Sequence, residues 1–535
     1  MNVALTQTGR ASGRASGRAS GRASGRASGR ASGRAGGPGA VLAALAAAQF
    51  TVMLATSIVN VALPQIRAGA GLSDSGTTWV VNAYGLAFGA LLLAGGRIAD
   101  LLGRRRVLTA GLALFALASV AAGLTTSAGV LIAARAVQGV GAAAIAPAAL
   151  ALVMDRFPPG PGRGRALGVW GAVSGAGAAG GVLLGGLLTQ VWGWPWIFHI
   201  VALGSAAVLA AVVVLVPRDA AAGAGANAGP GAEQPGGRQH GRFDLLGTVT
   251  VTLALTCLVW GLTTARGAGW TGVPVLGSLG AAVVLLAAFC VIERRRPDAL
   301  VPPRMLTAGR VAAGNVLMAL LGSVWIALFF FLPLYQQQVL GSGPLATGVG
   351  QLPLALAHMI GSALAPRIAR VVGARATVTA ALLTEAAGLL WLSWMRADGS
   401  YLVDVLGPSI LVGLGLSIAF VQLTSLAVDG VPRQDTGLAG GLVNTTRQVG
   451  GAIGLAALAT LAGSVTHRTP TGTPPPEALT AGYQAAFTTS AALLATTALL
   501  ALLLMRRSGA SGPTSTARPA TEPGASPLSP TGPAR

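Results

Sequence analysis

Ionisable side chains inside long apolar segments are the residues of this sequence best placed to do chemistry. Arg135 lies in the apolar segment around Ala143, Glu385 lies at the centre of a later segment, and His358 lies in the segment before that. A charge in such surroundings is costly, so its presence indicates function by default. Burial favours the neutral form of a carboxyl group, and histidine exchanges protons near neutral pH. The sequence therefore predicts that these three residues couple proton transfer to another process.

Each of the three residues also has a structural explanation. A structural Arg135 bonds helix carbonyls or Gln138, a structural Glu385 is a neutral acid that fixes helix packing, and a structural His358 is packed and hydrogen-bonded. The His, Cys, Asp and Glu residues show no clustering with metal-ligand spacing. The sequence predicts no metal, no cofactor and no catalytic cluster of the kind that a membrane enzyme needs.

Polar and aromatic residues in the apolar segments form a second set, which are candidates for lining a substrate cavity. Aromatic faces attract cations without demanding one substrate shape. Helix–helix hydrogen bonding explains any single member equally well. Arg447, in a late segment, is predicted to seal a cytoplasmic gate or to contact lipid headgroups. The cavity candidates are Asn60, Asn82, Tyr84, Gln138, Asn315, Trp325, Tyr335, Gln337, Gln422 and Asn444.

The composition of the whole chain indicates that these residues belong to a membrane protein. Of the 535 residues, 53% are hydrophobic and only 10% are charged, against about 25% charged residues in an average soluble domain. The apolar runs are continuous rather than alternating, and about fourteen of them reach the roughly 20 residues that a spanning helix needs. We therefore expect an all-α membrane protein, with a lipid bilayer as its surroundings.

The net charge of +21 comes from arginines, because the sequence contains no lysine. These arginines recur in alternate loops between apolar segments, where they set membrane orientation rather than bind nucleic acid. The pattern predicts both termini in the cytoplasm. It divides the chain into a disordered basic tail at 1–39, a six-helix bundle at 40–217, a cytoplasmic linker at 218–243, two extra spans at 244–293, a second six-helix bundle at 294–507 and a disordered tail at 508–535.

A motif after the second segment reads GGRIADLLGRRR. Gly96 permits close helix contact, Gly103 turns the chain, and Asp100 pairs with an arginine such as Arg104 or accepts from a helix N-terminus. This arrangement predicts a charge lock that holds one conformation of a switch, although a plain basic loop is the alternative. A degraded second copy at 361–375 suggests two homologous halves.

A glycine-rich stretch in the fifth segment reads GAGAAGGVLLGGLL. Glycines at this spacing let two helices approach closely. The predicted packing motif consists of Gly181, Gly185 and Gly186.

The GGRIADLLGRRR motif resembles the signature of the major facilitator superfamily. Further stretches resemble its fourteen-span drug:proton antiporter group, the multidrug efflux transporters of the quaternary-ammonium type. These stretches are TSIVNVALP at 56–64, WVVNAYGLAFGALLLAGG at 79–96, the residues around Arg135, the glycine-rich fifth segment, FLPLYQQQVLG at 331–341 and GLVNTTRQVGGAIG at 441–454.

The resemblance implies two six-helix bundles plus two extra helices that export drugs or hydrophobic and cationic metabolites in exchange for protons. The protein is then an inner-membrane transporter and not an enzyme, monomeric, with a small-molecule substrate and protons as its partners. Two departures weaken the coupling: Ala55 stands where the group has an aspartate, and Val182 where it has a proline. An uncoupled or importing transporter is the alternative, while a membrane enzyme or a sensor ranks lower.

Overall fold

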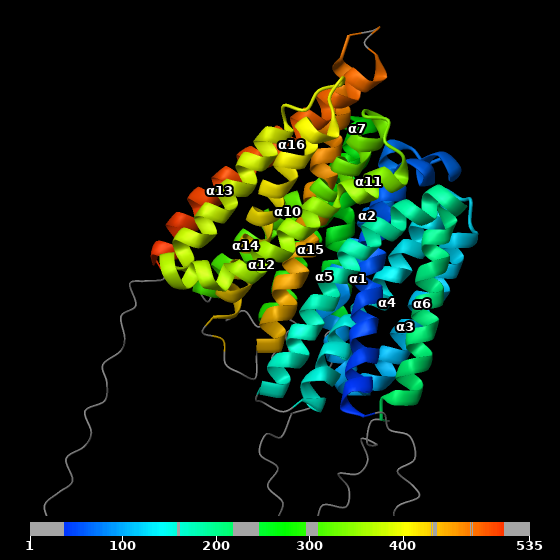
Figure 1. The fold of residues 1–535 in the computed structure, drawn as a ribbon, viewed down its shortest axis with the longest axis vertical. Helices are drawn as coiled ribbons and strands as arrows, with labels where there is room; N and C mark the ends of the chain where they lie inside the picture. Colours follow the sequence, from blue (N-terminus) through cyan, green and yellow to red (C-terminus); the bar gives the residue numbers. More distant parts are fainter. Residues whose placement is uncertain are drawn as a thin grey trace, which may run out of the picture.

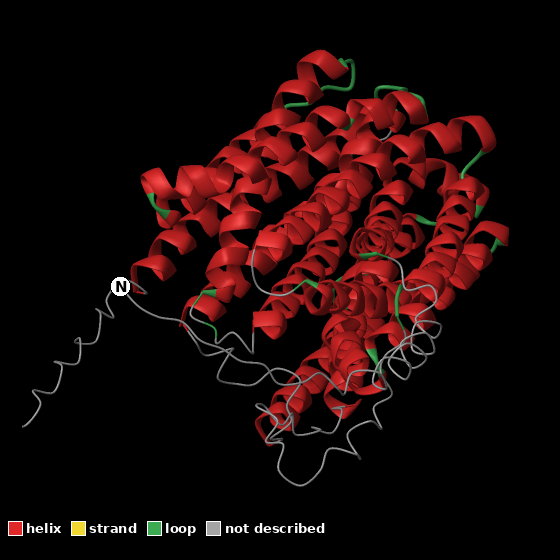
Figure 2. Cartoon of the chain, turned by 60° about the horizontal axis from the view of Figure 1, so that its bottom comes forward, coloured by secondary structure: helices red, strands yellow, loops and turns green. Residues whose placement is uncertain are grey.

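The computed structural model describes residues 37–157, 161–217, 245–295, 309–429, 431, 436–470, 472 and 474–507. Every element in this part is helical, and none is a strand (Figure 2). The prediction of an all-α protein is thereby confirmed. The predicted tails, apart from 37–39, and the whole of the predicted linker at 218–243 lie outside the described residues.

The first half of the chain contains six long helices. They are α1 (Pro38–Gly69), α2 (Asp74–Leu102), α3 (Arg104–Leu124), α4 (Ala128–Arg156), α5 (Pro161–Trp192) and α6 (Pro195–Leu215). Proline begins α1, α5 and α6, where its missing N–H costs nothing because the first-turn amides of a helix lack partners inside it. Ser73 caps α2 by accepting a hydrogen bond from the Gly76 amide at 3.1 Å.

Two further helices, α7 (Leu245–Ala268) and α8 (Val273–Arg295), precede the second half. The second half contains α10 (Gly309–Gln338), α11 (Pro344–Gly350), α12 (Leu352–Val372), α13 (Ala374–Leu392), the π-helix η2 (Tyr401–Leu406), α14 (Gly407–Val428), α15 (Thr436–Arg468) and α16 (Pro475–Arg507). η2 leads directly into α14, and one residue separates α11 from α12, so each of these pairs forms a single passage through the molecule.

The same packing pattern occurs in both halves. In the first, α1 packs on α5 and α6, α2 on α4, and α3 on α4 and α6; in the second, α10 packs on α15 and α16, α12 on α14, and α13 on α14 and α16. The turn after α2 and the turn after α12 also match, because Gly103 (φ 98°) and Gly373 (φ 84°) each end one helix and begin the next. This left-handed conformation favours glycine. The degraded second copy of the motif thus lies at the corresponding place in the second half.

Twelve of the described helices are long and apolar enough to cross a membrane, or thirteen if the bent α2 counts as one span. The chain is therefore a multi-span membrane protein. The helix around Glu385, α13, is outside this count, because Arg375 and Glu385 lower the mean hydropathy of its 19 residues. The number fourteen stays a prediction.

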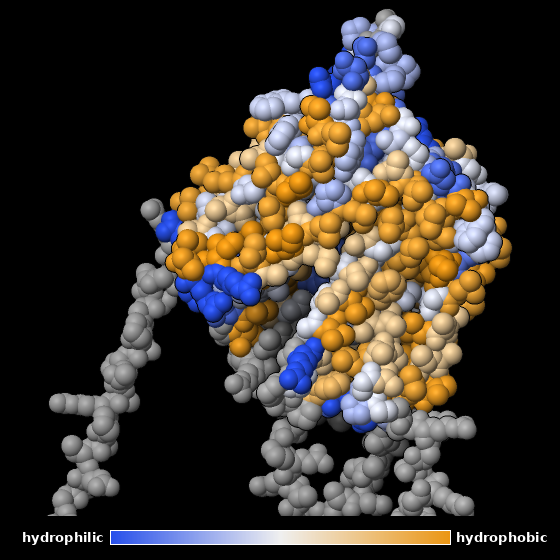
Figure 3. Space-filling model, viewed as in Figure 1, coloured by the Kyte–Doolittle hydropathy of each residue, from blue (hydrophilic) through white to orange (hydrophobic). Residues whose placement is uncertain are grey.

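The extra helices lie beside both halves. α7 packs on α2 of the first half and on α15 of the second, and α8 packs on α7. Trp79 of α2 donates to Thr263 of α7 at 3.1 Å, and Thr460 of α15 donates to the Leu262 carbonyl at 2.9 Å. The outer face of α8 presents Val273, which is 84% exposed, with other exposed aliphatic side chains. An apolar surface of this kind suits contact with lipid, and Figure 3 shows a broad apolar band on the viewed face of the molecule.

The glycines of α5 bring its backbone close to α1. A Cβ added at Gly181 would collide with the Ser57 hydroxyl and lie 2.8 Å from the Leu54 carbonyl, and one at Gly185 would lie 2.5 Å from the Ile58 carbonyl. At Gly180, by contrast, the nearest atom is the Phe50 ring at 3.8 Å. Gly181 and Gly185 therefore set the distance between α1 and α5, and Gly180 does not.

The variant Gly181→Ala is expected to lower the stability of the protein by about 1–3 kcal/mol, the usual cost of overpacking. The matched variant Gly180→Ala fits in the available space and should leave stability unchanged or slightly raised. Thermal denaturation of both variants in detergent, followed by size-exclusion chromatography, measures the difference. Equal melting temperatures for the two would contradict the close contact at Gly181.

Candidate functional site

The helix ends fall into two groups at opposite ends of the molecule. We call the end that contains the α2–α3 turn, the last turn of α4 and the first turn of α10 the basic end, because arginines concentrate there. We call the other end, with the α1–α2 and α5–α6 turns, the opposite end. In Figure 1 the basic end is at the bottom, where α12, α13 and α14 slant away from α5.

The predicted lock residues form an ion network at the basic end. Arg104, the first residue of α3, bonds Asp100 of α2 at 2.8 Å and also bonds Asp155 of α4. Gly103 makes the turn that lets Arg104 reach back to Asp100, and Gly96 faces Pro147 of α4. Every described bond of Asp100 and Arg104 lies within the first half, so this network ties α2, α3 and α4 together without bridging the halves.

Arg135 lies at the centre of a buried hydrogen-bond network in the first half. Its side chain is 1% exposed and donates from Nε to the Val80 carbonyl at 2.9 Å and from Nη1 to Gln138 at 2.8 Å. Gln138 donates in turn to Ser119 at 2.7 Å. The guanidinium carbon is also 4.4 Å from the centre of the Tyr84 ring. The network links α2, α3 and α4, which is the arrangement expected of a structural arginine.

A second arginine, Arg447 of α15, meets aromatic side chains in the second half. Its guanidinium carbon lies 5.0 Å from the Trp325 ring centre and 6.0 Å from that of Phe420. Trp325 packs edge-on against Phe420 at 5.2 Å and against His358 at 5.4 Å. We call Trp325, His358, Phe420, Asn444 and Arg447 the C-half cluster.

The C-half cluster faces the interior of the molecule. Its members come from α10, α12, α14 and α15, and their side chains meet where these four helices converge, so they do not face lipid. All five are nevertheless partly exposed, in contrast to the fully buried Arg135 network. The cluster therefore borders an accessible space inside the protein. Arg447 lies within α15 with its guanidinium over aromatic rings, and both roles predicted for it stay predictions.

The other predicted cavity residues have different surroundings. Gln138, Tyr84 and Asn82 are at most 1% exposed, and the Asn82 amide donates to the Ala452 carbonyl of α15 at 3.3 Å. Tyr335 is 0% exposed and donates to the Arg396 carbonyl at 2.8 Å. These four side chains bond helices together instead of lining an opening. The sequence could not separate the two roles, because both use the same polar residue types.

Two further cavity candidates, Gln422 and Asn60, are buried. Gln422 donates to the Ala365 carbonyl at 3.0 Å, and Asn60 is buried with its carbonyl oxygen lacking a partner. Asn444 differs from these because it accepts from Arg447 at 2.8 Å and so belongs to the C-half cluster.

The three residues predicted to couple protons lie apart. Arg135 belongs to the first half and His358 to the C-half cluster. Glu385 is 0% exposed, lies against Gly415 where α13 meets α14, and neither of its carboxyl oxygens has a hydrogen-bond partner. No described hydrogen bond or ion pair joins any two of the three.

The two halves touch at the opposite end. Gln337 of α10 donates to the Val61 carbonyl of α1 at 2.7 Å and accepts from Gln65 at 3.1 Å. The Leu345 amide of α11 donates to Gln190 of α5 at 3.1 Å. Gly186 of α5 completes this contact, since a Cβ there would collide with the Pro344 carbonyl. Gln337 was predicted to line a cavity, but its bonds close this end.

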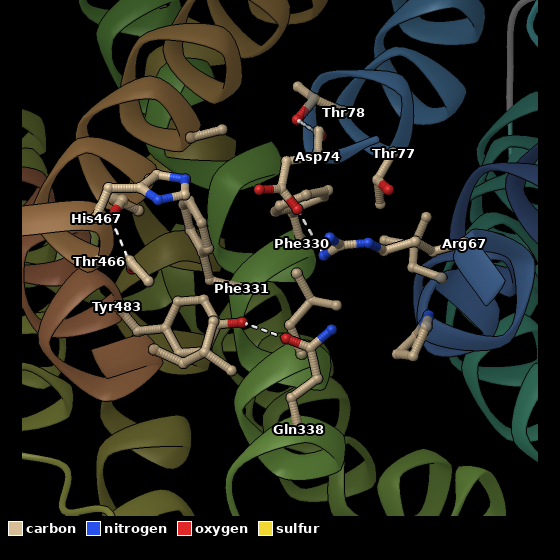
Figure 4. Close-up of a pocket in the computed structure, with 17 residues that line it drawn as sticks. Arg67, Asp74, Thr77, Thr78, Phe330, Phe331, Gln338, Thr466, His467 and Tyr483 are labelled. Atoms are coloured by element: carbon tan, nitrogen blue, oxygen red, sulfur yellow. Dashed lines mark hydrogen bonds and ion pairs between the residues drawn. The ribbon is translucent and has the colours of Figure 1, made fainter. Parts of the chain in front are cut away.

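A cavity of about 170 Å³ remains within the closed opposite end. Figure 4 shows Arg67 of α1 directed at Asp74 of α2, an ion pair of 2.6 Å, and Tyr483 of α16 directed at Gln338 of α10, a hydrogen bond of 2.7 Å. Both halves therefore contribute walls. Nearby, the hydrogen bond from Arg396 to Asp404 raises the pKa of the Arg396 guanidinium.

The two ends of α5 have different surroundings. At Gly168, Gly171 and Gly175, in the first part of α5, an added Cβ would meet no atom within 4 Å, whereas Gly186 at the other end of this helix touches α11. The described contact of α5 with α11 therefore lies at the opposite end, and Figure 1 shows α12, α13 and α14 slanting away from α5 toward the basic end.

The comparisons with known proteins agree with this architecture. Residues 45–455 match the model of the Major Facilitator Superfamily. The chain belongs to the major facilitator superfamily.

Among curated relatives, the cephamycin export protein CmcT of Amycolatopsis lactamdurans is 40% identical over 79% of this chain and 85% of its own length. The puromycin resistance protein pur8 of Streptomyces alboniger is also 40% identical, over 79% and 82%. Among solved structures, an auto-inhibited POT family peptide transporter has a TM-score of 0.62 at 17% identity and covers 88% of this chain and 96% of that one.

Membership of the major facilitator superfamily makes the protein a transporter and not an enzyme. It also identifies the repeated halves as the two bundles expected of this fold. Sequence reasoning missed Phe420, Ser119 and Gln65 as participants. Nothing in the local sequence around Gln65 could indicate its contact, because its hydrogen-bond partner Gln337 is 272 residues away.

Removal of the acceptor in the Arg135 network is expected to destabilise the first half of the transporter. Gln138→Leu removes the acceptor of Arg135 Nη1 and the donor to Ser119, while the bond from Arg135 Nε to the Val80 carbonyl remains, and we expect a cost of about 1–3 kcal/mol. Gln138→Glu keeps an acceptor and adds a charge partner, so stability should be retained. Melting temperatures of the two purified variants measure this, and a fully stable Gln138→Leu protein would show that Arg135 does not depend on this bond.

Proposed function

We propose that the protein exports drugs or hydrophobic or cationic metabolites from the cytoplasm in exchange for protons, by alternating access between two halves. The observation that carries this proposal is the asymmetry of the interface: Gln337 and Gly186 join the halves at the opposite end, while the first part of α5 has no neighbour at the basic end. The names of the two relatives, one an export protein and one a resistance protein, support an outward direction of transport.

The arginine-rich loops support a cytoplasmic basic end, and with it cytoplasmic termini, because positively charged loops are retained on the cytoplasmic side. In this orientation the structure corresponds to the loading state of an exporter. Rocking of one half against the other then exposes the same interior to the outside. The Asp100–Arg104 network is formed in the present conformation and lies within the first half, so it holds α2, α3 and α4 together at the basic end.

Of the three residues that the sequence suggested for proton coupling, we assign the proton to Glu385. Glu385 is the one acid among the described residues that lies in the middle of a long helix, and its carboxyl oxygens lack partners. A carboxyl group without a counter-ion is able to gain and lose a proton as its surroundings change. Its place between α13 and α14, away from Arg135, means that coupling acts through helix packing. An uncoupled or importing transporter of the same fold is the alternative, motivated by Ala55 in α1.

Everted membrane vesicles with an acid interior test the proposal. We expect vesicles that contain the transporter to accumulate a fluorescent drug, and to lose it when the pH gradient is collapsed. The variant Glu385→Gln, which keeps the shape of the side chain but cannot titrate, is expected to transport with a flattened pH dependence. Vesicles without the protein are the control. Gradient-independent accumulation would favour the uncoupled alternative, and wild-type pH dependence in Glu385→Gln would remove Glu385 from the mechanism.

Alternating access predicts that joining the halves at the opposite end stops transport. Gln65→Cys and Gln337→Cys, in a background with Cys257 and Cys290 replaced by serine, place two thiols across the interface. A short reducible cross-linker should abolish transport, and reduction should restore it.

The matched control joins two positions of one half. Arg67→Cys and Asp74→Cys lie at the same end, on α1 and α2, which do not separate. Cross-linking of this pair should leave its transport rate unchanged. Continued transport after complete cross-linking of the first pair would exclude rocking about this contact.

A further inference from the structure

Arg447 is an interior cation of the second half whose guanidinium has N–H groups without hydrogen-bond partners. Arg135 uses Nε and Nη1 in bonds to acceptors of its own half. Arg447 has one described hydrogen bond, to Asn444 at 2.8 Å, and its buried Nε has no partner. No acidic side chain among the described residues pairs with it. A guanidinium in such a place has lost hydration without receiving a counter-charge, which is costly.

No acid of the described structure is available to supply that charge. The described acidic residues other than Glu385 lie at or near helix ends or in loops. Glu385 is 0% exposed between α13 and α14, away from the accessible space. The interior around the C-half cluster therefore carries a positive charge and offers nothing that attracts a cation except the aromatic faces, one side of which Arg447 already occupies.

The shape of the cluster favours a flat ring beside the charge. Trp325 and Phe420 stand edge to face at 79°, with Arg447 over both rings. His358, packed on Trp325, adds a polar ring edge on the other side. All of these residues are partly exposed, so a ligand can reach their side chains.

We propose that the C-half cluster is a binding site for aromatic anions, in which Arg447 holds a carboxylate and Trp325 and Phe420 contact the adjoining ring. The assignment rests on the proposed export function and narrows its substrate range from cations to acids. Arginine suits this role because its planar fork binds a carboxylate through two hydrogen bonds. Asn444 is the positioning residue, since its side-chain oxygen accepts a hydrogen bond from Nη2 of the guanidinium at 2.8 Å.

Fluorescein and rhodamine 123 test the charge preference, because they share a xanthene ring but carry opposite charge. Fluorescence polarisation with the purified full-length protein gives both affinities. We expect tighter binding of fluorescein, and a loss of about tenfold or more in fluorescein affinity for Arg447→Gln. Rhodamine 123 binding should be equal or stronger in that variant. Arg468→Gln removes the same charge from the exposed end of the same helix and should change neither affinity.

A second variant leaves Arg447 in place. Asn444→Asp supplies an internal carboxylate beside the guanidinium, and should weaken fluorescein binding to a similar degree. Rhodamine 123 binding in the same preparation reports that the protein is folded. Unchanged fluorescein affinity in Arg447→Gln and Asn444→Asp, or tighter binding of rhodamine 123 by the wild-type protein, would overturn the site.

Transport in everted vesicles separates this inference from the proposed function. Export of rhodamine 123 without binding or export of fluorescein would overturn the anion site and leave export standing. Arginine-dependent binding of fluorescein without transport of either probe would establish the site and refute the export function. Export of fluorescein that is lost in Arg447→Gln supports both.

Discussion

The structure depends on the cost of placing polar and charged groups where water is absent. A bilayer offers no hydrogen bonds, so each such group must find a partner in the protein. Arg135 meets this demand completely, through Val80, Gln138 and the Tyr84 ring. The bonds tie α2, α3 and α4 together. Arg447 meets the demand in part, and the residual cost is what makes its surroundings a place for a ligand.

The two halves therefore share one helix arrangement, but their buried arginines have different roles. Their helices pack in the same pattern, and Gly103 and Gly373 make the same turn. Yet the buried arginine of the first half holds helices together, while that of the second half borders an accessible space. Such a division suits a transporter in which one half is a rigid partner and the other contacts the substrate first.

The halves meet where α2 packs on α15, and at the opposite end where α5 meets α11 and α1 meets α10. Glycine lets α5 approach α11 at Gly186, and amide side chains provide the hydrogen bonds around Gln337. None of these interfacial bonds involves an ion pair, so they can exchange partners without moving a charge through an apolar region. α7 packs on α2 and α15 together, so it covers the seam between the halves on that side and leaves the α5 side free.

The sequence by itself determined the class of the protein, its repeated halves and its helix-packing glycines. Apolar runs, arginine-rich loops and a motif with a second copy are local patterns, and local patterns fix local structure. Only the tertiary structure decided which polar residues bond helices and which face an opening. Gln138 and Asn444 are amides of similar chemistry in similar segments, yet one is buried beside Arg135 and the other flanks an accessible Arg447. That difference depends on which helix face meets which neighbour, across separations that no sequence spacing encodes.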